Sequence, residues 1–437
     1  MEITAATLQF IRAHADGDVR QLAFLASAHP DVDLPFALNQ IAGRQMAREK
    51  LPAWAATEGM IYPPHLSMEQ CSSQSTALYK ARLVQRLLGE PCGNACPQDQ
   101  KISAKQEKTE EKDASASSVL VDLTGGFGVD FSFLARAFDA AVYVERQSGL
   151  CEIARHNFPL LGLHHANVVC AEAETYLHTM SQADIVFLDP ARRDAQGGKT
   201  VLIHHCTPNL CALLDTLMVK ARWVVVKLSP MLHWQAAVET LQQQGAWVRQ
   251  VHIVSVRNEC KELLFVLSAP PSSPLAEGET TSPQVVCVND DAAFSYRFPD
   301  ESTAPQRLFR GVLSAGMYLY EPHSSLMKAG CFGLLTVRWP VEALAANSHL
   351  FVSTDEVADF PGRRFQLLAL SSFNKKELKN ALLGLRQAHI ATRNFPLGAE
   401  ALRKRLKIKD GGDTYLFATT DVQNHHWLLV CRKIPTA

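Results

Sequence analysis

A glycine-rich segment, Asp122-Leu-Thr-Gly-Gly-Phe-Gly-Val-Asp130, directly follows the apolar residues 119–121. Glycines at a turn from a strand into a helix let the backbone approach a ligand closely, and the start of that helix favours negative charge. A dinucleotide fingerprint would have a third glycine where this chain has Phe131, so that ligand is disfavoured. The acid before the turn suits instead the sulfonium and amino groups of S-adenosylmethionine. We expect four residues of the segment to bind this cofactor: Asp122, Gly125, Gly126 and Gly128.

Two further acids follow strand-like runs in places where they could contact the same ligand. Glu145 closes the run AAVYVE, and a carboxylate there can accept hydrogen bonds from both ribose hydroxyls. An ordinary solvated glutamate is the alternative, but the distance of Glu145 downstream of the glycine turn favours ribose binding. Glu172 follows a third strand, where an acid commonly meets the adenine amine, with Glu174 as the alternative.

The run ADIVFLDPARR places an acid and a proline at the end of a fourth strand. It resembles the Asp-Pro-Pro signature of amino- and nucleic-acid-directed methyltransferases, with alanine in place of the second proline. Asp189 would project an acceptor into the ligand crevice and orient or deprotonate an acceptor amine, while Pro190 stiffens the turn. Arg192 and Arg193 could hold phosphate or form an ordinary surface salt-bridge pair. We therefore expect Asp189, Pro190 and Arg192 to serve catalysis.

Ser229 precedes Pro230 at the end of a fifth strand. The 5-methyluridine methyltransferases carry a nucleophilic cysteine in a comparable place, and serine without a neighbouring base is a far poorer nucleophile. This favours direct transfer of a methyl group to nitrogen or oxygen over covalent addition to a pyrimidine.

Strand-like and helix-like segments alternate through residues 118–270, which predicts an α/β, Rossmann-like, doubly wound sheet. The short joint RNECK between its last two strands predicts an antiparallel edge strand. Helical spacing of apolar residues predicts a helical N-terminal domain at 1–90, and Ser67 with Gln70 has the spacing of a capping box. The polar residues 91–117 are typical of a flexible linker. After 283 we expect small α+β modules, the first at 283–320 with a helical stretch QRLFRGVLSAGMY, the second at 321–437.

The composition is that of a globular protein, with 47% apolar and 20% charged residues. No run of eighteen apolar residues predicts a membrane span, and the first residues do not resemble a secretion signal. Eleven scattered cysteines indicate reduced thiols, and hence a cytoplasmic protein. Cys92 and Cys96 have no further clustered ligands in the sequence, so we expect no metal site.

Positive charge is concentrated between Lys375 and Lys409, where ten lysines and arginines stand against two acids. A charge run is usually a solvated face. In a chain whose net charge is −1, however, so uneven a concentration favours a polyanionic partner. We expect four residues of this stretch to contact RNA: Arg393, Arg403, Lys404 and Arg405.

Nine segments in order give the chain a family resemblance: EQCSSQSTALYKA, DLTGGFGVD, FLDPARR, VVKLSPML, VSVRNECKELLF, LYEPHSSLMKAG, NSHLFVS, FPGRRF and RNFP. The chain resembles the bacterial class I S-adenosylmethionine-dependent methyltransferases that carry a ferredoxin-like segment and a C-terminal THUMP-like domain. The resemblance implies that residues 283–320 are the ferredoxin-like segment and 321–437 the THUMP-like domain. It also implies that Gln70 and Ser73 cover the cofactor from the N-terminal side. Asn258, Glu259 and Lys261 fit a structural turn network and a catalytic role equally well.

The sequence thus predicts a methyltransferase that acts on structured RNA, tRNA or rRNA, by direct methyl transfer. Two alternatives remain open. One is a noncatalytic RNA-binding protein with a relic Rossmann domain, against which the intact glycine turn, Glu145 and Asp189 speak. The other is a small-molecule methyltransferase, for which two appended modules and a basic face would be unnecessary.

Overall fold

The computed structural model describes residues 3–89, 117–192, 203–271, 280–299 and 301–435. The chain forms two compact units. Unit 1 comprises Met1–Gln250 and Leu263–Thr281, and unit 2 comprises Val251–Glu262 and Ser282–Ala437. The predicted linker at 91–117 lies outside the described residues except for residue 117. Cys92, Cys96 and Arg193 also lie outside them.

Unit 1 begins with helices, as predicted: α1 (Ala5–Ala13), α2 (Val19–Leu22), α3 (Leu34–Lys50), α4 (Pro52–Ala56), α5 (His65–Gln70) and α6 (Gln74–Gly89). Side chains of Thr4, Asp18 and Asp33 cap the first three of these α-helices by accepting backbone N–H groups.

The capping box predicted at Ser67 is wrong. Ser67 lies inside α5, whose N-cap is Pro64, and Gln70 is the exposed last residue of that helix. Ser73 caps the next helix instead, because its Oγ accepts the backbone N–H of Thr76 at 3.3 Å. The sequence signal for a helix start was therefore real but six residues too early.

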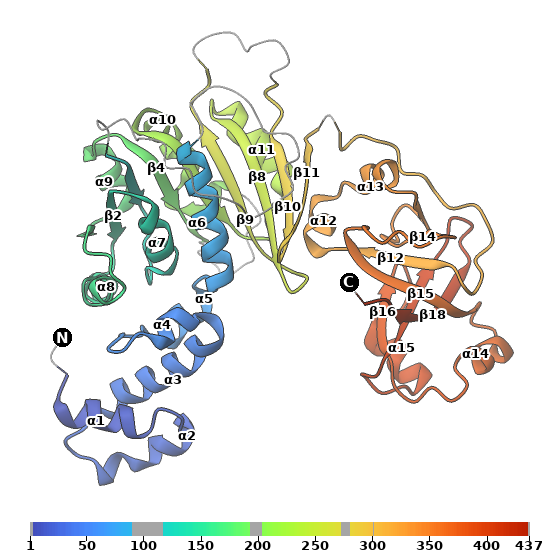
Figure 1. Cartoon of the computed structure of the whole chain (residues 1–437), viewed down its shortest axis with the longest axis horizontal. Coiled ribbons are helices and arrows are strands. Elements are labelled where there is room, and N and C mark those ends of the chain that lie inside the picture. Colours follow the sequence, from blue (N-terminus) through green and yellow to red (C-terminus); the bar gives the residue numbers. More distant parts are fainter. Residues whose placement is uncertain (1–2, 90–116, 193–202, 272–279, 300, 436–437) are drawn as a thin grey trace, which may run out of the picture. The chain divides into compact units, whose positions relative to one another are not determined.

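Within the described residues, the larger sheet has nine strands in the order β11-β10-β8-β9-β7-β4-β1-β2-β3 (Figure 1). Its strands are β1 (Val119–Asp122), β2 (Ala140–Glu145), β3 (Ala166–Cys170), β4 (Ala183–Leu188), β7 (Ala221–Leu228), β8 (Trp247–Val256), β9 (Glu259–Ser268), β10 (Gln284–Asn289) and β11 (Ala292–Arg297). The pairs β3–β2, β2–β1, β1–β4 and β4–β7 are parallel. The connections contain α7 (Val129–Leu134), α8 (Ser148–Leu160), α9 (Ala173–Thr179) and α10 (Leu210–Lys220), and α11 (Trp234–Gln243) precedes β8. The predicted Rossmann-like α/β fold is confirmed.

The predicted antiparallel edge strand is wrong in its position. β9 is antiparallel to β7, but it lies between β7 and β8 inside the sheet. Residues 262–268 are all buried, and such an apolar run needs neighbours on both sides.

Residues 284–297 also differ from the expectation. They form β10 and β11, an antiparallel hairpin of the nine-stranded sheet, rather than the start of a separate module. The helix predicted at 306–318 is absent from this described stretch. Leu308 forms a parallel bridge with Ala343, and the N–H of Phe309 donates to the Ala343 carbonyl at 2.8 Å, so the backbone is extended there.

Unit 2 holds a sheet of seven strands in its described part, in the order β13-β14-β12-β15-β18-β17-β16. These are β12 (Tyr318–Pro322), β13 (Glu342–Ala343), β14 (Phe351–Ser353), β15 (Gly362–Ser371), β16 (His389–Arg393), β17 (Thr414–Thr420) and β18 (His426–Lys433). Its helices are α12 (Ser324–Ala329), α13 (Phe332–Arg338), α14 (Lys375–Ala381) and α15 (Ala399–Leu406). Alternate residues of β17 enter different apolar clusters, Phe417 with Phe365 and Leu416 with Leu402 of α15. Both faces of this strand are therefore buried.

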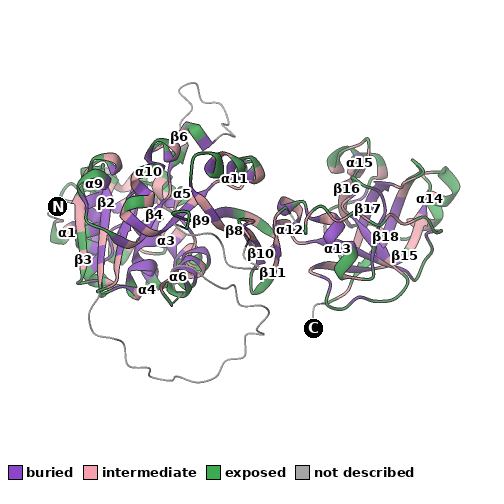
Figure 2. Cartoon of the chain, turned by 90° about the horizontal axis from the view of Figure 1, so that it is seen from above, coloured by how far each residue is buried: buried purple, intermediate pink, exposed green. Residues whose placement is uncertain are grey.

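Figure 2 shows the buried residues concentrated in the strands and the exposed ones on helices and loops. Among the described residues, no helix combines the length and the apolar character needed to cross a bilayer.

Candidate functional site

The glycine turn joins β1 to α7, and its glycines let other groups approach the backbone closely. A Cβ atom on Gly125 would overlap the ring of Tyr143, so this position accepts no side chain. Gly128 has φ +83° and precedes the first residue of α7, a left-handed conformation that favours glycine. The Tyr143 hydroxyl donates a hydrogen bond to the carbonyl of Gly126, and this bond ties the glycine turn to β2.

Glu145 stands beside this turn at the end of β2. Its Oε2 accepts the N–H of Gly126 and its Oε1 accepts the N–H of Gln147, both at 2.9 Å. The residue is 8% exposed. The carboxylate is therefore held at the mouth of the glycine turn, where a ligand lying on the turn would meet it.

Asp122 is the buried acid of the site, 1% exposed, with the Thr124 N–H donating to its Oδ1 at 3.0 Å. Burial raises the pKa of Asp122 well above its usual range despite that hydrogen bond. The neighbouring carboxylates Asp130, Asp189 and Glu145 raise it further. Such a gathering of acids is costly unless a cationic group joins it, and an ammonium or sulfonium ligand would relieve the repulsion.

Asp189 follows β4 and is linked to the glycine turn and to β7. Its N–H donates to the hydroxyl of Thr124 at 2.6 Å. Its Oδ2 accepts the ammonium of Lys227, from β7, at 2.6 Å. The side chain is 40% exposed, so the ion pair with Lys227 leaves part of the carboxylate open to solvent.

A buried charge network, which the sequence reasoning missed, extends from Asp189 to the N-terminal helices. Lys227 also lies 3.5 Å from Asp130 Oδ2, and the fully buried Lys80 of α6 lies 3.2 Å from Asp130 Oδ1. Ser72 donates to Asp130 at 2.8 Å and accepts from Lys80 at 3.2 Å. Burial alone would raise the pKa of Asp130, but Lys80, Lys227 and the Ser72 hydrogen bond outweigh it and lower the pKa.

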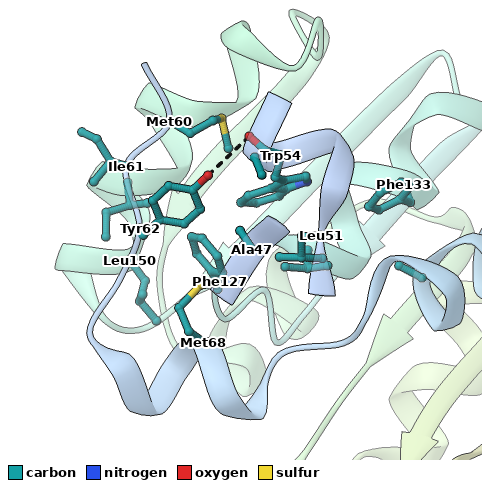
Figure 3. Close-up of a cluster of buried hydrophobic side chains, with 14 residues drawn as sticks. Ala47, Leu51, Trp54, Met60, Ile61, Tyr62, Met68, Phe127, Phe133 and Leu150 are labelled. Carbon is teal, nitrogen blue, oxygen red and sulfur yellow. Dashed lines mark hydrogen bonds between the residues drawn. The ribbon is translucent and has the colours of Figure 1, made fainter. Parts of the chain in front are cut away.

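An apolar cluster holds the N-terminal helices against the glycine turn (Figure 3). Phe127, from the middle of the turn, packs edge-on against Trp54 of α4 with ring centroids 4.8 Å apart. Beside the cluster, the buried Asn157 of α8 exchanges two hydrogen bonds with the backbone of Ile61, at 2.9 and 2.8 Å. The helical domain is thus fixed to the glycine turn and to α8, the helix that follows Glu145 in the chain.

The remaining predicted cofactor residues are placed less centrally. Gln70 is exposed, and the Ser73 hydroxyl is engaged in capping α6, whereas the neighbouring Ser72 faces Asp130. Glu172 is exposed at the N-cap of α9, without a side-chain capping bond. Glu174 lies in the first turn of that helix.

The other residues considered for catalysis are Pro190, Arg192 and Ser229. Pro190 is buried after β4, and Arg192 belongs to the short strand β5 (Ala191–Arg192), paired with β6 (Cys206–Thr207). Ser229 Oγ accepts the N–H of Met231 at 3.1 Å, the hydrogen bond of a local turn.

In the part of the chain that the structure describes, no group of three or more His, Cys, Asp or Glu side chains is arranged to hold a metal ion.

In unit 2, Asn258 acts as a turn residue. Its N–H donates to Asn289 at 3.0 Å and its Oδ1 accepts the N–H of Ser324 at 2.9 Å. Glu259 and Lys261 form an ion pair of 2.6 Å with both side chains well exposed. These contacts explain all three residues as a turn network.

The four predicted RNA-contacting residues divide into two pairs. Arg393 binds Glu321 at 2.7 Å and Arg403 binds Asp410 at 2.8 Å, so both are engaged within the protein. Lys404 and Arg405 are exposed on α15.

Family models match two consecutive parts of unit 2. A ferredoxin-like domain matches residues 318–361 and a THUMP domain-like model matches residues 362–433. The predicted kinds of module are confirmed, but the matches lie elsewhere than predicted. The ferredoxin-like match covers 318–361 and not 283–320, and the THUMP domain-like match begins at 362 and not at 321. The two domains share one sheet, since β12 pairs antiparallel with β15.

The whole chain is similar to a solved structure from Porphyromonas gingivalis W83 named a "putative methyltransferase". The two are 28% identical with a TM-score of 0.78, over 99% of this chain and 98% of that one. A curated relative, an "uncharacterized RNA methyltransferase" from Thermosynechococcus vestitus, is 36% identical over 93 residues. That match spans 21% of this chain and 21% of the relative.

Proposed function

Because the chain combines the class I methyltransferase fold with ferredoxin-like and THUMP-like domains, we propose that it transfers a methyl group from S-adenosylmethionine to structured RNA. The observation that carries the cofactor is the glycine turn with Glu145 held at its mouth and Asp122 buried beneath it. Four acids, Asp122, Asp130, Glu145 and Asp189, lie close together. The ion pairs of Lys80 and Lys227 with this group are formed with Asp130 and Asp189. This donor set fits a cationic ligand.

In this proposal each residue has a physical role. S-adenosylmethionine, when bound, supplies a methyl group already activated by its positive sulfur. Glu145 would accept hydrogen bonds from the ribose hydroxyls, and Asp122 would face the ammonium group. Asp189 Oδ1 would accept a proton from the acceptor amine, while Lys227 holds Oδ2 and so fixes the carboxylate.

We expect Glu145→Ala to weaken S-adenosylmethionine binding by about tenfold to a hundredfold. Each charge-assisted hydrogen bond that is removed is worth about 1.5–3 kcal/mol. Titration calorimetry of the full chain measures this, with Glu239→Ala, at an exposed position on α11, as a matched control that should bind almost normally. Undiminished binding by the Glu145 variant would refute the ribose assignment, and no binding by the wild type would refute the cofactor.

RNA as the acceptor is supported by the exposed charges of unit 2. Eight of the ten basic residues between Lys375 and Lys409 are exposed: Lys375, Lys376, Lys379, Arg386, Lys404, Arg405, Lys407 and Lys409. A surface of this kind attracts a polyanion. The THUMP domain-like match in the same region is consistent with that role.

The salt dependence of RNA binding tests these charges. Lys404→Gln/Arg405→Gln should flatten the plot of log affinity against log salt concentration by about 0.7 for each phosphate of a single strand that the variant no longer neutralises. Removal of two exposed charges from the N-terminal helices, in Arg20→Gln/Arg82→Gln, should leave the slope unchanged. Filter binding across salt concentrations compares the three proteins. Identical slopes would show that α15 is merely a solvated face.

A further inference from the structure

A buried glutamate in unit 2 holds two arginines. Glu321, at the end of β12, has a side chain 3% exposed. Its Oε2 accepts two donors of Arg363, the Nε at 2.8 Å and the Nη2, and its Oε1 accepts the Nη2 of Arg393 at 2.7 Å. β15 carries Arg363 and β16 carries Arg393, although β15, β18 and β17 separate β12 from β16 in the sheet.

His349 is influenced electrostatically by this cluster. Burial lowers the pKa of His349, and the positive charge of Arg393 lowers it further. It stacks on Phe332 with ring centroids 4.3 Å apart and has a φ of +53°. Glu321, Arg363, Arg393 and His349 come from four segments of the family resemblance: LYEPHSSLMKAG, FPGRRF, RNFP and NSHLFVS. None of these segments has a part in the proposed methyl transfer.

The cluster is poorly explained as a stabilising device. Two guanidinium groups on one carboxylate leave an excess positive charge, and buried ion triads are often replaceable by apolar side chains without loss of stability. The arginines also keep capacity for a ligand. Their side chains are 31% and 35% exposed, and the buried Nε of Arg393 has no hydrogen-bond partner. Glu321 occupies the Nε–Nη2 edge of Arg363 and so fixes that planar group, whose other edge, with Nη1, can still donate to a phosphate.

We propose that Arg363 and Arg393 bind a phosphate group and that Glu321 positions them for it. The identification of this phosphate as one carried by RNA rests on the proposed function. The phosphate site itself does not, because inorganic phosphate presents the same oxygens.

The test compares binding of inorganic phosphate by the full-length wild type and by Arg393→Lys and Arg363→Gln, using equilibrium dialysis in chloride of constant ionic strength. We expect each substitution to weaken phosphate binding about tenfold or more, because a charge-assisted fork is removed. Arg432→Gln, an exposed arginine on β18, is the matched control and should bind phosphate normally. Retained S-adenosylmethionine binding shows that unit 1 of each variant is folded, and near-ultraviolet circular dichroism reports on unit 2.

Equal phosphate binding by the wild type and a folded Arg393→Lys variant would overturn the proposal, as would no phosphate binding by the wild type. If phosphate also competes with RNA, and Arg393→Lys weakens RNA binding, the phosphate is one that RNA carries. If phosphate binding falls in the variant while RNA binding is unchanged, the site takes free phosphate. Failure of the wild type to methylate RNA would leave the dialysis result standing, so the two proposals fail separately.

Discussion

Asp189→Asn should slow methyl transfer by about 10²–10⁴-fold while it leaves S-adenosylmethionine affinity nearly unchanged. The substitution keeps the size of the side chain and the hydrogen bond from the N–H of residue 189 to the Thr124 hydroxyl. The amide cannot, however, accept a proton from the acceptor. The proposed transfer of a proton to Asp189 takes place near the transition state, so the substitution should lower kcat. Single-turnover transfer of labelled methyl groups to RNA measures the rate.

Asp184→Asn is the matched control for this substitution. Asp184 lies at the opposite end of β4, where its Oδ2 accepts the N–H of Val119 at 2.9 Å, away from the proposed acceptor. The Asp184→Asn variant should transfer methyl groups at the wild-type rate. A variant of Asp189 that lost cofactor affinity and turned over normally once saturated would identify Asp189 as a cofactor residue.

Lys80→Met should lower the free energy of unfolding by about 3–5 kcal/mol. The lysine is 0% exposed and its removal leaves Asp130, whose side chain is 10% exposed, with less compensation in the protein interior. Urea unfolding followed by tryptophan fluorescence measures the change. Arg82→Met, an exposed position on the same helix, should change stability by less than about 0.5 kcal/mol.

The pH dependence separates a charge effect from a packing effect. The pKa of Asp130 is lowered in the folded protein, so its ionisation stabilises the fold above the ordinary carboxyl pKa of about 3.9. That contribution is lost as the pH falls through the lowered value. The stability difference between the wild type and Asp130→Asn should therefore shrink below about pH 4. A difference that stays constant down to acid pH would attribute the effect to packing.

The parts of the site that could be predicted from sequence are the local ones. Glu145 is the last residue of β2 and Asp189 directly follows β4, and the end of a parallel strand places such a residue at the carboxyl edge of the sheet whatever the rest of the chain does. The glycine turn is only partly local: the left-handed φ of Gly128 belongs to the turn itself, whereas a side chain at Gly125 is excluded by the ring of Tyr143 on β2.

The charge network was missed because it joins residues far apart in the sequence. Ser72 and Lys80 reach Asp130 across 58 and 50 positions, and no periodicity reports such a contact. A signal was nevertheless present. Lys80 lies on the face of α6 that carries Ala77, Leu83 and Leu87, and a lysine in an apolar stripe needs a buried partner.

Two errors in the fold have a similar origin. A strand's place in a sheet depends on its partners, so the hairpin-like joint before β9 could not show that β9 lies between β7 and β8. The stretch 306–318 has apolar residues compatible with a helix, but pairing of Leu308 and Phe309 with Ala343 extends the backbone. Tertiary contacts decided both cases.

Transfer of a labelled methyl group from S-adenosylmethionine to RNA tests the proposed function most directly. The substrate is total RNA from cells that lack the gene, with RNA from cells that carry it as the control, since its sites are already modified. We expect the wild type to label the first RNA and not the second, and Asp189→Asn to label neither at a comparable rate. Equal labelling of both RNAs, or none of either by a wild type that binds S-adenosylmethionine, would contradict RNA methylation by this protein.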